Sequence, residues 1–308
     1  MSDIQGRNNV LNRAQKYTVA QFNAEFPDDD ACIAYIMNER HPGNILTCEK
    51  CKVERKHYRI TGRKVYGCDH CGTQISPLAG TIFEKSSTSL KMWFHAMFQM
   101  GSTKCGISAK QIQRETGVTY KTAWRMFKQI RTLMSEDVKL EGDSAVEVDE
   151  MYHGGKAKNG NGRRMNGDKK KTPVFGMVER GGKVVARTVK HARSSEVFPI
   201  IKECVLPMST IYSDEAKIYD GVEHMKNPVY RHRRINHSQA MYVMGDVHTN
   251  TLEGFWSLIK RGLSGTHHSV SAKYLQEYLN EYSFRYNRRS EPKPMFRMIL
   301  DQVSERAE

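Results

Sequence analysis

The chain of 308 residues is longer than one compact domain usually needs, so we expect two or three domains. It carries 48 Lys and Arg residues against 34 Asp and Glu residues, and the formal charge of +14 favours polyanionic partners, nucleic acids first among them. A hydrophobic content of 39% excludes a wholly disordered chain. The longest apolar run, Ala31 to Met37, is far shorter than the ~20 residues of a transmembrane helix, which excludes a membrane span.

The N-terminal segment, residues 1–45, is expected to be helical after a polar start that lacks the apolar stretch of a secretory signal. Without that signal the chain should stay in a reducing compartment, where cysteines act as metal ligands or core residues. Apolar residues recur at helical spacing over residues 18–40. We interpret the acidic run from Asp28 to Asp30 as the start of a helix and not as a metal site, because acidic side chains match the helix dipole there.

Residues 46–82 contain two C-x-x-C pairs separated by sixteen residues, Cys48 with Cys51 and Cys68 with Cys71. Between the pairs, residues 57–60 and 64–66 flank Thr61-Gly62-Arg63, which is the pattern of a small hairpin. Zn²⁺ prefers four ligands in a tetrahedron, and each C-x-x-C turn supplies one edge of it. We therefore predict a zinc ribbon with one structural Zn²⁺; a redox dithiol is the alternative.

Residues 83–140 carry the pattern of a helix-turn-helix. Ser108 and Gln111 form a capping box, Gly117 supplies a turn, and Thr119 caps a second helix that reaches toward Met134. On that second helix the basic residues share a face apart from the apolar one: Lys121, Arg125, Lys128 and Arg131. The pattern predicts docking in a DNA groove; the alternative is an ordinary helical hairpin with a solvated basic face.

From residue 141 to 308 the pattern changes to alternating strands and helices, interrupted by a basic insertion at residues 153–172. Strand patterns lie at residues 145–152, 173–178, 184–189, 210–213 and 229–232, and helical patterns at 195–205 and 251–262. Three antiparallel strands, helix, strand, helix, strand, helix is the order of a ribonuclease-H-like fold. We predict a multidomain α+β chain whose last domain is ribonuclease-H-like, with a mixed five-stranded sheet and helices.

Three acidic residues occupy the positions in this order where a metal site would form. Asp149 lies on the first strand, Asp214 ends the fourth strand, and Glu253 lies on a late helix, on the same face as Lys260. Phosphoryl transfer with two magnesium ions needs hard oxygen ligands that converge from different elements, so a wide spacing in the sequence is expected. Three other acids remain as alternatives: Glu147 and Glu150 in place of Asp149, and Asp246 in place of Glu253.

With these motifs, the chain resembles bacterial insertion-sequence transposases of the DDE type, in the ISXO-like group that carries an N-terminal zinc ribbon. The resemblance extends from about residue 22 to residue 287. It is carried by the paired cysteines and by the motifs GTIFEKSST at 80–88, VEVDE at 146–150, YSD at 212–214, HTNTLEGFW at 248–256 and KRG at 260–262.

The resemblance implies that Asp149, Asp214 and Glu253 hold two Mg²⁺ or Mn²⁺ ions. Asn250 occupies a signature position of the group, and either it or Glu253 completes the metal shell; we favour Glu253 because a carboxylate binds magnesium better. His248 and Lys260 are implied as auxiliary residues that contact the reacting phosphate. The implied reaction is in-line phosphoryl transfer without a covalent enzyme intermediate, which separates the chain from serine and tyrosine recombinases.

Further basic residues suit contacts with DNA phosphates. They are Lys169 and Lys170 in the insertion, Arg233 and Arg234 near the last strand, and Arg261 after the late helix motif. The insertion could instead remain a solvated loop.

We therefore expect a transposase of the bacterial cytoplasm, associated with the nucleoid, that acts without a membrane. Its predicted partners are double-stranded DNA, both the terminal repeats of its element and the target, and further copies of itself in a homodimer or higher oligomer. One alternative is a domesticated, non-catalytic regulator that uses the ribbon and the helix-turn-helix only to bind DNA. The other is a ribonuclease-H-like nuclease or resolvase, which cuts DNA but does not join strands.

Overall fold

The computed structural model describes residues 17–140, 145–154, 171–234 and 250–305. The chain divides into two compact units: the first combines Met1–Met134 with Ser290–Glu308, and the second is Ser135–Arg289. Within the described residues, no helix is both long enough and apolar enough to cross a membrane.

The first unit begins with two short helices, α2 (Val19–Glu25) and α3 (Asp29–Arg40). The Thr18 hydroxyl and the Gln21 side chain form a capping box at the start of α2. At the start of α3 the Asp28 carboxylate accepts a hydrogen bond from the Ala31 amide at 2.9 Å. The acidic run therefore caps a helix, as predicted from the match between its charges and the helix dipole.

A small antiparallel sheet follows the short 3₁₀ helix η1 (Pro42–Asn44). Its strands, in spatial as well as chain order, are β1 (Ile45–Thr47), β2 (Glu54–Arg59), β3 (Tyr66–Cys68) and β4 (Gln74–Ile75). Strands β2 and β3 form the predicted hairpin, and Gly62 adopts a φ of 77° in the turn between them. The register pairs His57 with Cys68, so the sheet brings the second cysteine pair beside the first.

Three helices complete the N-terminal part of the first unit: α4 (Leu90–Ser102), α5 (Ala109–Thr116) and α6 (Tyr120–Leu133). The Ser108 hydroxyl accepts from the Gln111 amide, and the Thr119 hydroxyl accepts from the Thr122 amide. Between α5 and α6, Gly117 adopts the left-handed conformation with a φ of 73°. The predicted helix, turn and helix are thus present, and both hydroxyl caps form. The reciprocal half of the capping box is absent: the Gln111 side chain donates to Glu115 and does not bond back to the Ser108 amide.

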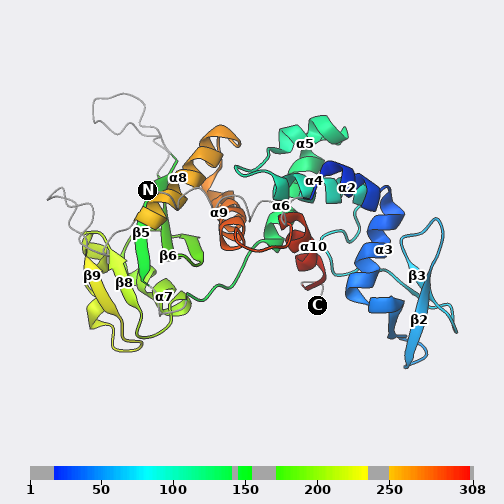
Figure 1. The fold of residues 1–308 in the computed structure, drawn as a ribbon, viewed down its shortest axis with the longest axis horizontal. Helices are drawn as coiled ribbons and strands as arrows, with labels where there is room; N and C mark the ends of the chain where they lie inside the picture. Colours follow the sequence, from blue (N-terminus) through cyan, green and yellow to red (C-terminus); the bar gives the residue numbers. More distant parts are fainter. Residues whose placement is uncertain (1–16, 141–144, 155–170, 235–249, 306–308) are drawn as a thin grey trace, which may run out of the picture. The chain divides into compact units, whose positions relative to one another are not determined.

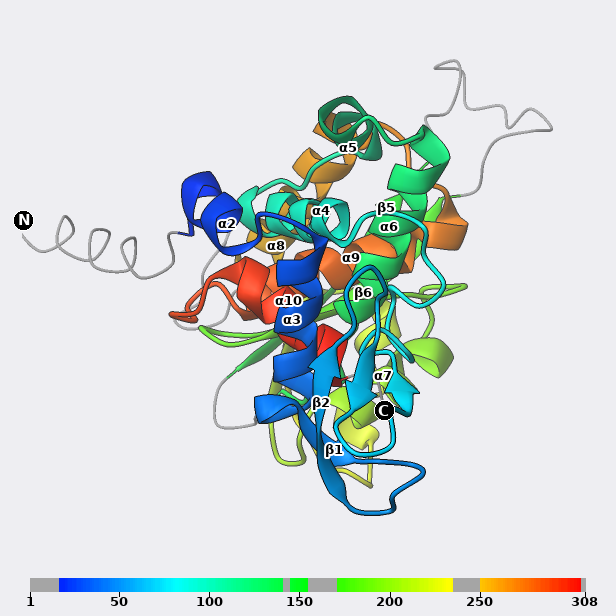
Figure 2. The same cartoon turned by 90° about the vertical axis from the view of Figure 1, so that its right-hand side faces the viewer.

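The C-terminal helix α10 (Met295–Glu305) packs in the first unit, where it contacts α3, α4 and α6 (Figure 2). Its Phe296 ring lies within 6 Å of the rings of Phe22, Phe26 and Phe98. The helices approach so closely that a Cβ added to Gly101 would lie 2.8 Å from the Phe296 amide nitrogen. Residues 141–308 were predicted to form one catalytic domain, but α10 lies in the first unit, because its apolar face completes the aromatic core there.

The second unit is built on a five-stranded mixed sheet with the order β7-β6-β5-β8-β9. Its strands are β5 (Val146–His153), β6 (Thr172–Glu179), β7 (Val184–Thr188), β8 (Thr210–Ser213) and β9 (Arg231–Arg234). The first three strands pair antiparallel, whereas β8 runs parallel to β5 and β9 runs parallel to β8. The ribonuclease-H-like α/β architecture predicted from the sequence is confirmed.

Helices cover both faces of this sheet (Figure 1). Helix α7 (Ser194–Cys204) packs on the face that carries Val146 and Val148, and α8 (Asn250–Gly265) and α9 (Ala272–Asn287) pack on the opposite face. Where the predicted order has a helix between the fourth and fifth strands, the structure has two 3₁₀ helices, η2 (Lys217–Tyr219) and η3 (Val222–His224). Gly221 separates the two short helices and interrupts a continuous helix there.

Candidate functional site

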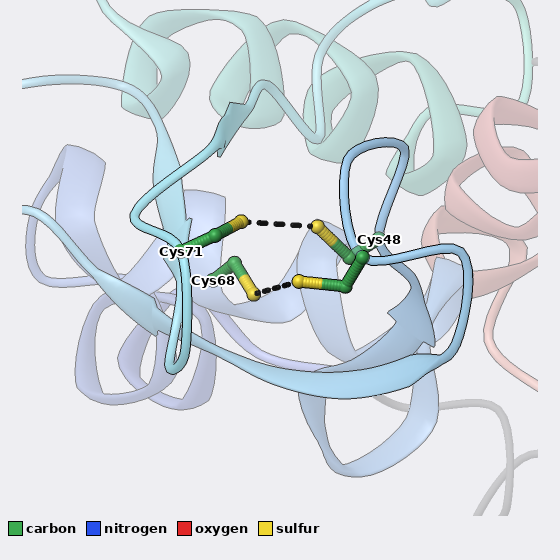
Figure 3. A group of neighbouring side chains, drawn as sticks. Cys48, Cys68 and Cys71 are labelled. Carbon is green, nitrogen blue, oxygen red and sulfur yellow. Dashed lines mark hydrogen bonds between the residues drawn. The ribbon is translucent and has the colours of Figure 1, made fainter.

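The four paired cysteines come together at one end of the small sheet (Figure 3). Their sulfur atoms all lie within 4.8 Å of one another, with 3.5 Å between Cys48 and Cys71 and 4.0 Å between Cys51 and Cys68. Each pair sits on a tight turn: the Lys52 amide donates to the Cys48 carbonyl, and the Gly72 amide donates to the Cys68 carbonyl. Two equivalent turns therefore present two sulfur atoms each to a common centre.

This donor set fits a closed, tetrahedral zinc site. A hydrogen bond with Thr73 lowers the pKa of the Cys71 thiol to about 6, whereas the contact with Cys71 raises the pKa of the Cys51 thiol to about 12. The first thiol is therefore close to the thiolate that a metal needs, and a bound cation would have to displace the proton of the second. His70 lies beside the cluster, with its Nδ1 3.7 Å from the Cys51 sulfur, but four thiolates already complete a tetrahedron. The remaining cysteines lie elsewhere: Cys32 and Cys204 are buried, and Cys105 is exposed.

A second candidate site lies between strand β5 and helix α8, in a cleft of about 580 Å³. Asp149, Glu253, Lys260 and Arg261 all line it. These side chains are up to 112 residues apart in the sequence, and only the packing of α8 on the sheet brings them together.

Asp214 follows β8, the strand next to β5. The parallel register pairs Glu147 with Tyr212, and Asp149 and Asp214 each lie two residues further along their strands. The Asp214 carboxylate accepts a hydrogen bond from the Ala216 amide at 3.0 Å, which holds it at the strand end. Its negative charge contributes to the raised pKa values of both Asp149 and Glu150, so these carboxylates lie close enough to interact.

Asp149 is held by two hydrogen bonds. The Trp256 indole Nε1 donates to Oδ2 at 3.0 Å, and the Glu150 amide donates to Oδ1 at 2.8 Å. Burial raises the pKa of this carboxyl to about 6, and the nearby charges of Glu150 and Asp214 act in the same direction, whereas both hydrogen bonds oppose the rise. A buried carboxylate next to other carboxylates is a site that a divalent cation would stabilise.

Glu150 points to the opposite face of the sheet from Asp149, where the Tyr219 hydroxyl donates to its Oε2 at 2.7 Å. Burial raises the pKa of Glu150, and the Asp214 charge adds to the rise. Burial also raises the pKa of Tyr219 well above its usual value, which keeps the phenol protonated as a donor. Sequence reasoning missed Tyr219, because a lone tyrosine between two strands carries no recognisable pattern.

Glu147, the other alternative to Asp149, has a different position and different partners. Its side chain is fully buried, and its Oε1 lies 2.9 Å from Nε of Arg180. It also accepts hydrogen bonds at 3.0 Å from the Thr251 amide, the Thr251 hydroxyl and the Leu252 amide. Glu147 thus anchors the first turn of α8 to strand β5 and is already saturated with partners.

The residues proposed for α8 divide between the cleft and its surroundings. Glu253, Lys260 and Arg261 are exposed side chains that line the cleft, whereas Asn250 is exposed at the first residue of the helix and is not part of the lining. Trp256 and Ser257 also line it. Neither residue was among the site residues predicted from the sequence. His248 and the alternative acid Asp246 lie outside the described residues.

The predicted DNA-contacting face of α6 is only partly accessible. Lys121 is exposed and Lys128 is half-buried, while the Arg125 guanidinium donates to the hydroxyls of Ser86 and Thr88. Arg131 is only 2% exposed and stacks over the Phe127 ring, so the prediction that it contacts DNA was wrong. Helix α6 packs against α4, α5 and α10, which buries a wider arc of its surface than a two-helix hairpin would.

The other basic residues lie at the edge of the second unit or outside the described part. Arg233 and Arg234 are exposed on the edge strand β9, where Arg234 pairs with Asp220. Lys169 and Lys170 fall outside the described residues, as does most of the basic insertion.

Known protein families match both candidate sites, the four-cysteine cluster and the sheet that carries the acids. Residues 139–287 match the family model of the ISXO2-like transposase domain, and residues 27–74 match that of the transposase zinc-ribbon domain. An uncharacterized protein in the transposable element ISH50 of Halobacterium salinarum is 29% identical over 280 residues, which cover 82% of this chain and 92% of that protein. An uncharacterized transposase-like protein of Haemophilus influenzae is 30% identical over 105 residues, or 34% of this chain and 81% of that protein. The two matched regions coincide with the four-cysteine cluster and with the sheet that carries the acids.

Proposed function

This chain belongs to the ISXO2-like transposase family, and from that premise we propose that it cleaves the ends of its insertion sequence and joins them to target DNA by metal-dependent phosphoryl transfer. The observation that carries this proposal is the cleft between β5 and α8. It combines Asp149 and Glu253 with the cations Lys260 and Arg261, and Asp214 follows the adjacent strand. Acids that could hold metal ions therefore lie beside basic groups that could hold a phosphate.

Asp149, Asp214 and Glu253 are the residues that would hold the ions, because they offer carboxylate oxygens from three separate elements. Bound divalent ions, Mg²⁺ or Mn²⁺, would activate the attacking hydroxyl and stabilise the leaving oxygen. We favour Glu253 over Asn250 as the third ligand, since Glu253 lines the cleft. Glu147 is excluded from this role by its buried ion pair with Arg180.

The basic residues of the cleft bind the DNA substrate in this proposal. Lys260 and Arg261 line the same cleft as Asp149 and Glu253, so their positive charges can hold a backbone phosphate against these acids. His248 would contact the same phosphate. We propose that no protein side chain acts as a nucleophile, because water and then a DNA 3′-hydroxyl serve in that role.

The first unit would bind the ends of the element. Its four-cysteine cluster holds one Zn²⁺ in this proposal, and the exposed Lys121 lies near the start of α6, the part of a recognition helix that enters the DNA groove. Lys128 and Arg125 extend the same surface, while Lys169, Lys170, Arg233 and Arg234 would contact the DNA backbone. Joining two ends to one target requires at least two copies of the active site, so we propose a homodimer or a larger homo-oligomer on DNA.

A strand-transfer assay tests this proposal. Purified protein, a duplex that carries the terminal repeat, a supercoiled target plasmid and Mg²⁺ should give joined products. Asp149→Asn, Asp214→Asn and Glu253→Gln should each lower their yield by about a thousandfold or more, since each removes a ligand charge. Glu203→Gln, which alters an exposed ion pair with Arg187, is the matched control and should retain activity.

Other outcomes of the same assay contradict the proposal in distinct ways. Cleaved but never joined DNA would identify a nuclease. DNA binding without cleavage in the parent protein would identify a regulator. A large loss in Asn250→Ala together with full activity in Glu253→Gln would reassign the third ligand.

A further inference from the structure

The indole of Trp256 occupies a notch in the sheet directly beside Asp149. The antiparallel register pairs Asp149 of β5 with Gly176 of β6, so both residues face α8. A Cβ added to Gly176 would lie 2.3 Å from Cζ2 and 2.4 Å from Cη2 of the indole, which no real side chain tolerates. Only glycine at position 176 leaves room for the ring against the sheet at the level of Asp149.

In this notch the ring is held so that its N–H points to the carboxylate. Trp256 is 3% exposed, and its Nε1 donates to Asp149 Oδ2 at 3.0 Å. The Glu150 amide donates to the other oxygen, Oδ1, at 2.8 Å. Each carboxylate oxygen thus accepts one hydrogen bond and retains a further lone pair for a cation.

We propose that Trp256 is a positioning residue for the metal site: its indole N–H, held by the notch at Gly176, sets the orientation in which Asp149 presents its carboxylate to the ions. The inference rests on the proposed function, because it concerns the same metal site. Groups that hydrogen-bond to metal ligands orient them and increase affinity for the ion.

A simple core residue would not need the hydrogen-bond donor. The preceding residue of α8, Phe255, is buried to the same extent and packs edge-to-face against Tyr286 with a ring that has no polar atom. Packing alone therefore accounts for an aromatic side chain at position 256. The N–H that donates to Asp149 is what distinguishes a positioning residue from a residue that only packs in the core.

Mn²⁺ binding to the full-length protein without DNA provides the test, with free Mn²⁺ followed by electron paramagnetic resonance. We expect Trp256→Phe to weaken Mn²⁺ binding about tenfold or more. Trp93→Phe is the matched control: Trp93 is also buried, its Nε1 donates to Ser86 at 3.1 Å in the first unit, and its loss should leave Mn²⁺ affinity unchanged.

A second replacement separates the donor from the shape of the ring. Substitution of Trp256 by β-(3-benzothienyl)alanine puts sulfur in place of the N–H and keeps a bicyclic ring of nearly the same size. This protein should fold like the parent, as judged by its circular dichroism spectrum, and should still bind Mn²⁺ about as weakly as Trp256→Phe.

The outcomes distinguish this inference from the proposed function. Parent-like Mn²⁺ affinity in the benzothienyl protein would overturn the positioning role; if Asp149→Asn still weakens binding, the metal site itself stands. Parent-like affinity in Asp149→Asn would overturn both, because Asp149 would then not hold the ion.

Discussion

The two units of this protein gather their candidate metal ligands in opposite ways. In the first unit, two tight turns bring four sulfur atoms within 4.8 Å of one another, and the two pairs are separated by only sixteen residues. In the second unit, the acids come from β5, from the end of β8 and from α8, and they are held by other protein groups: Trp256 for Asp149 and the Ala216 amide for Asp214. Among the described residues, only the cysteines form a group of three or more ligands as tight as this.

The difference corresponds to two uses of a metal. A closed set of ligands leaves no coordination position for a substrate, so its binding energy serves folding. Ligands that are spread along a cleft leave room for a phosphate between them, and the surrounding protein must then maintain the arrangement without the metal. The second unit therefore relies on buried contacts such as that between Glu147 and Arg180.

The largest effect is expected from removing the Zn²⁺ that we propose for the four-cysteine cluster of the first unit. Cys68→Ser, or treatment with a strong chelator, should unfold the ribbon, because structural Zn²⁺ contributes on the order of 10 kcal/mol to such small domains. Hydrogen exchange should then accelerate in β2 and β3 but not in β5 and β6. Cys105→Ser, which changes an exposed cysteine outside the cluster, is the control. If β2 stayed protected from hydrogen exchange in zinc-free protein, the first unit would not need its metal to fold. The proposed difference between the two units would then be wrong.

The next largest effect concerns the buried ion pair of Glu147 with Arg180, which anchors α8 to the sheet of the second unit. Glu147→Gln should destabilise that unit by about 3 kcal/mol, because it removes one charge of a buried pair and weakens the anchor of α8. Glu203→Gln removes the same charge from an exposed pair with Arg187 and should cost less than about 1 kcal/mol. Chemical denaturation, monitored by hydrogen exchange in β5, measures the loss of unfolding free energy in each variant. Equal losses in the two variants would show that the burial of Glu147 has no special role.

The pH dependence of stability gives a third, smaller effect. The pKa of Asp149 is raised to about 6 in the fold, whereas an unfolded Asp titrates near 4. The folded state therefore binds the proton more tightly, and metal-free protein should lose stability, up to about 2 kcal/mol, as the pH rises from 4 to 6.

Asp149→Asn should reduce that loss, and Mg²⁺ should stabilise the parent protein near pH 7 but not the variant. Thermal unfolding at pH 5, 6 and 7, with and without Mg²⁺, measures both differences. Asp137→Asn, which changes an exposed acid in the second unit, is the control. If the pH profile of stability were unchanged in Asp149→Asn, the pKa of Asp149 would not be raised by its surroundings in the fold.

The smallest effect separates accessible from buried basic residues within the first unit. Lys121→Ala should weaken DNA binding by about 1 kcal/mol or less and reduce the slope of log affinity against log salt by about 1. Arg131→Met should leave this slope unchanged, because the Arg131 side chain is buried against Phe127. DNA-binding titrations at several salt concentrations measure the slope for each variant. A slope that falls equally in Lys121→Ala and Arg131→Met would contradict the burial of Arg131.

Local patterns predicted much of the fold. The cysteine spacing, the caps at Ser108 and Thr119 and the turn at Gly117 act over a few residues, so the ribbon and the helix pair could be predicted from the sequence. The positions of the five strands along the second unit also followed from alternation within each segment. What could not be predicted is which amphipathic helix packs where: α10 has an apolar face that would suit either unit.

The candidate site shows the same limit at the level of single residues. Three acids in the VEVDE segment have similar surroundings in the sequence, yet Glu147 faces Arg180, Asp149 faces Trp256 and Glu150 faces Tyr219. Their different partners lie between 33 and 107 residues away and become neighbours only through tertiary packing. No periodicity can assign such roles in advance.

Helix α10 has a consequence for the order in which the molecule is made. The helix is synthesised after the whole of the second unit, yet Phe296 lies in the aromatic core of the first unit with Phe22 and Phe26. A ribosome must therefore read through the second unit before the first can close its core. Chains that stop early through a nonsense codon or a frameshift would leave those aromatic rings uncovered, so we expect DNA recognition to belong to completed chains and not to fragments.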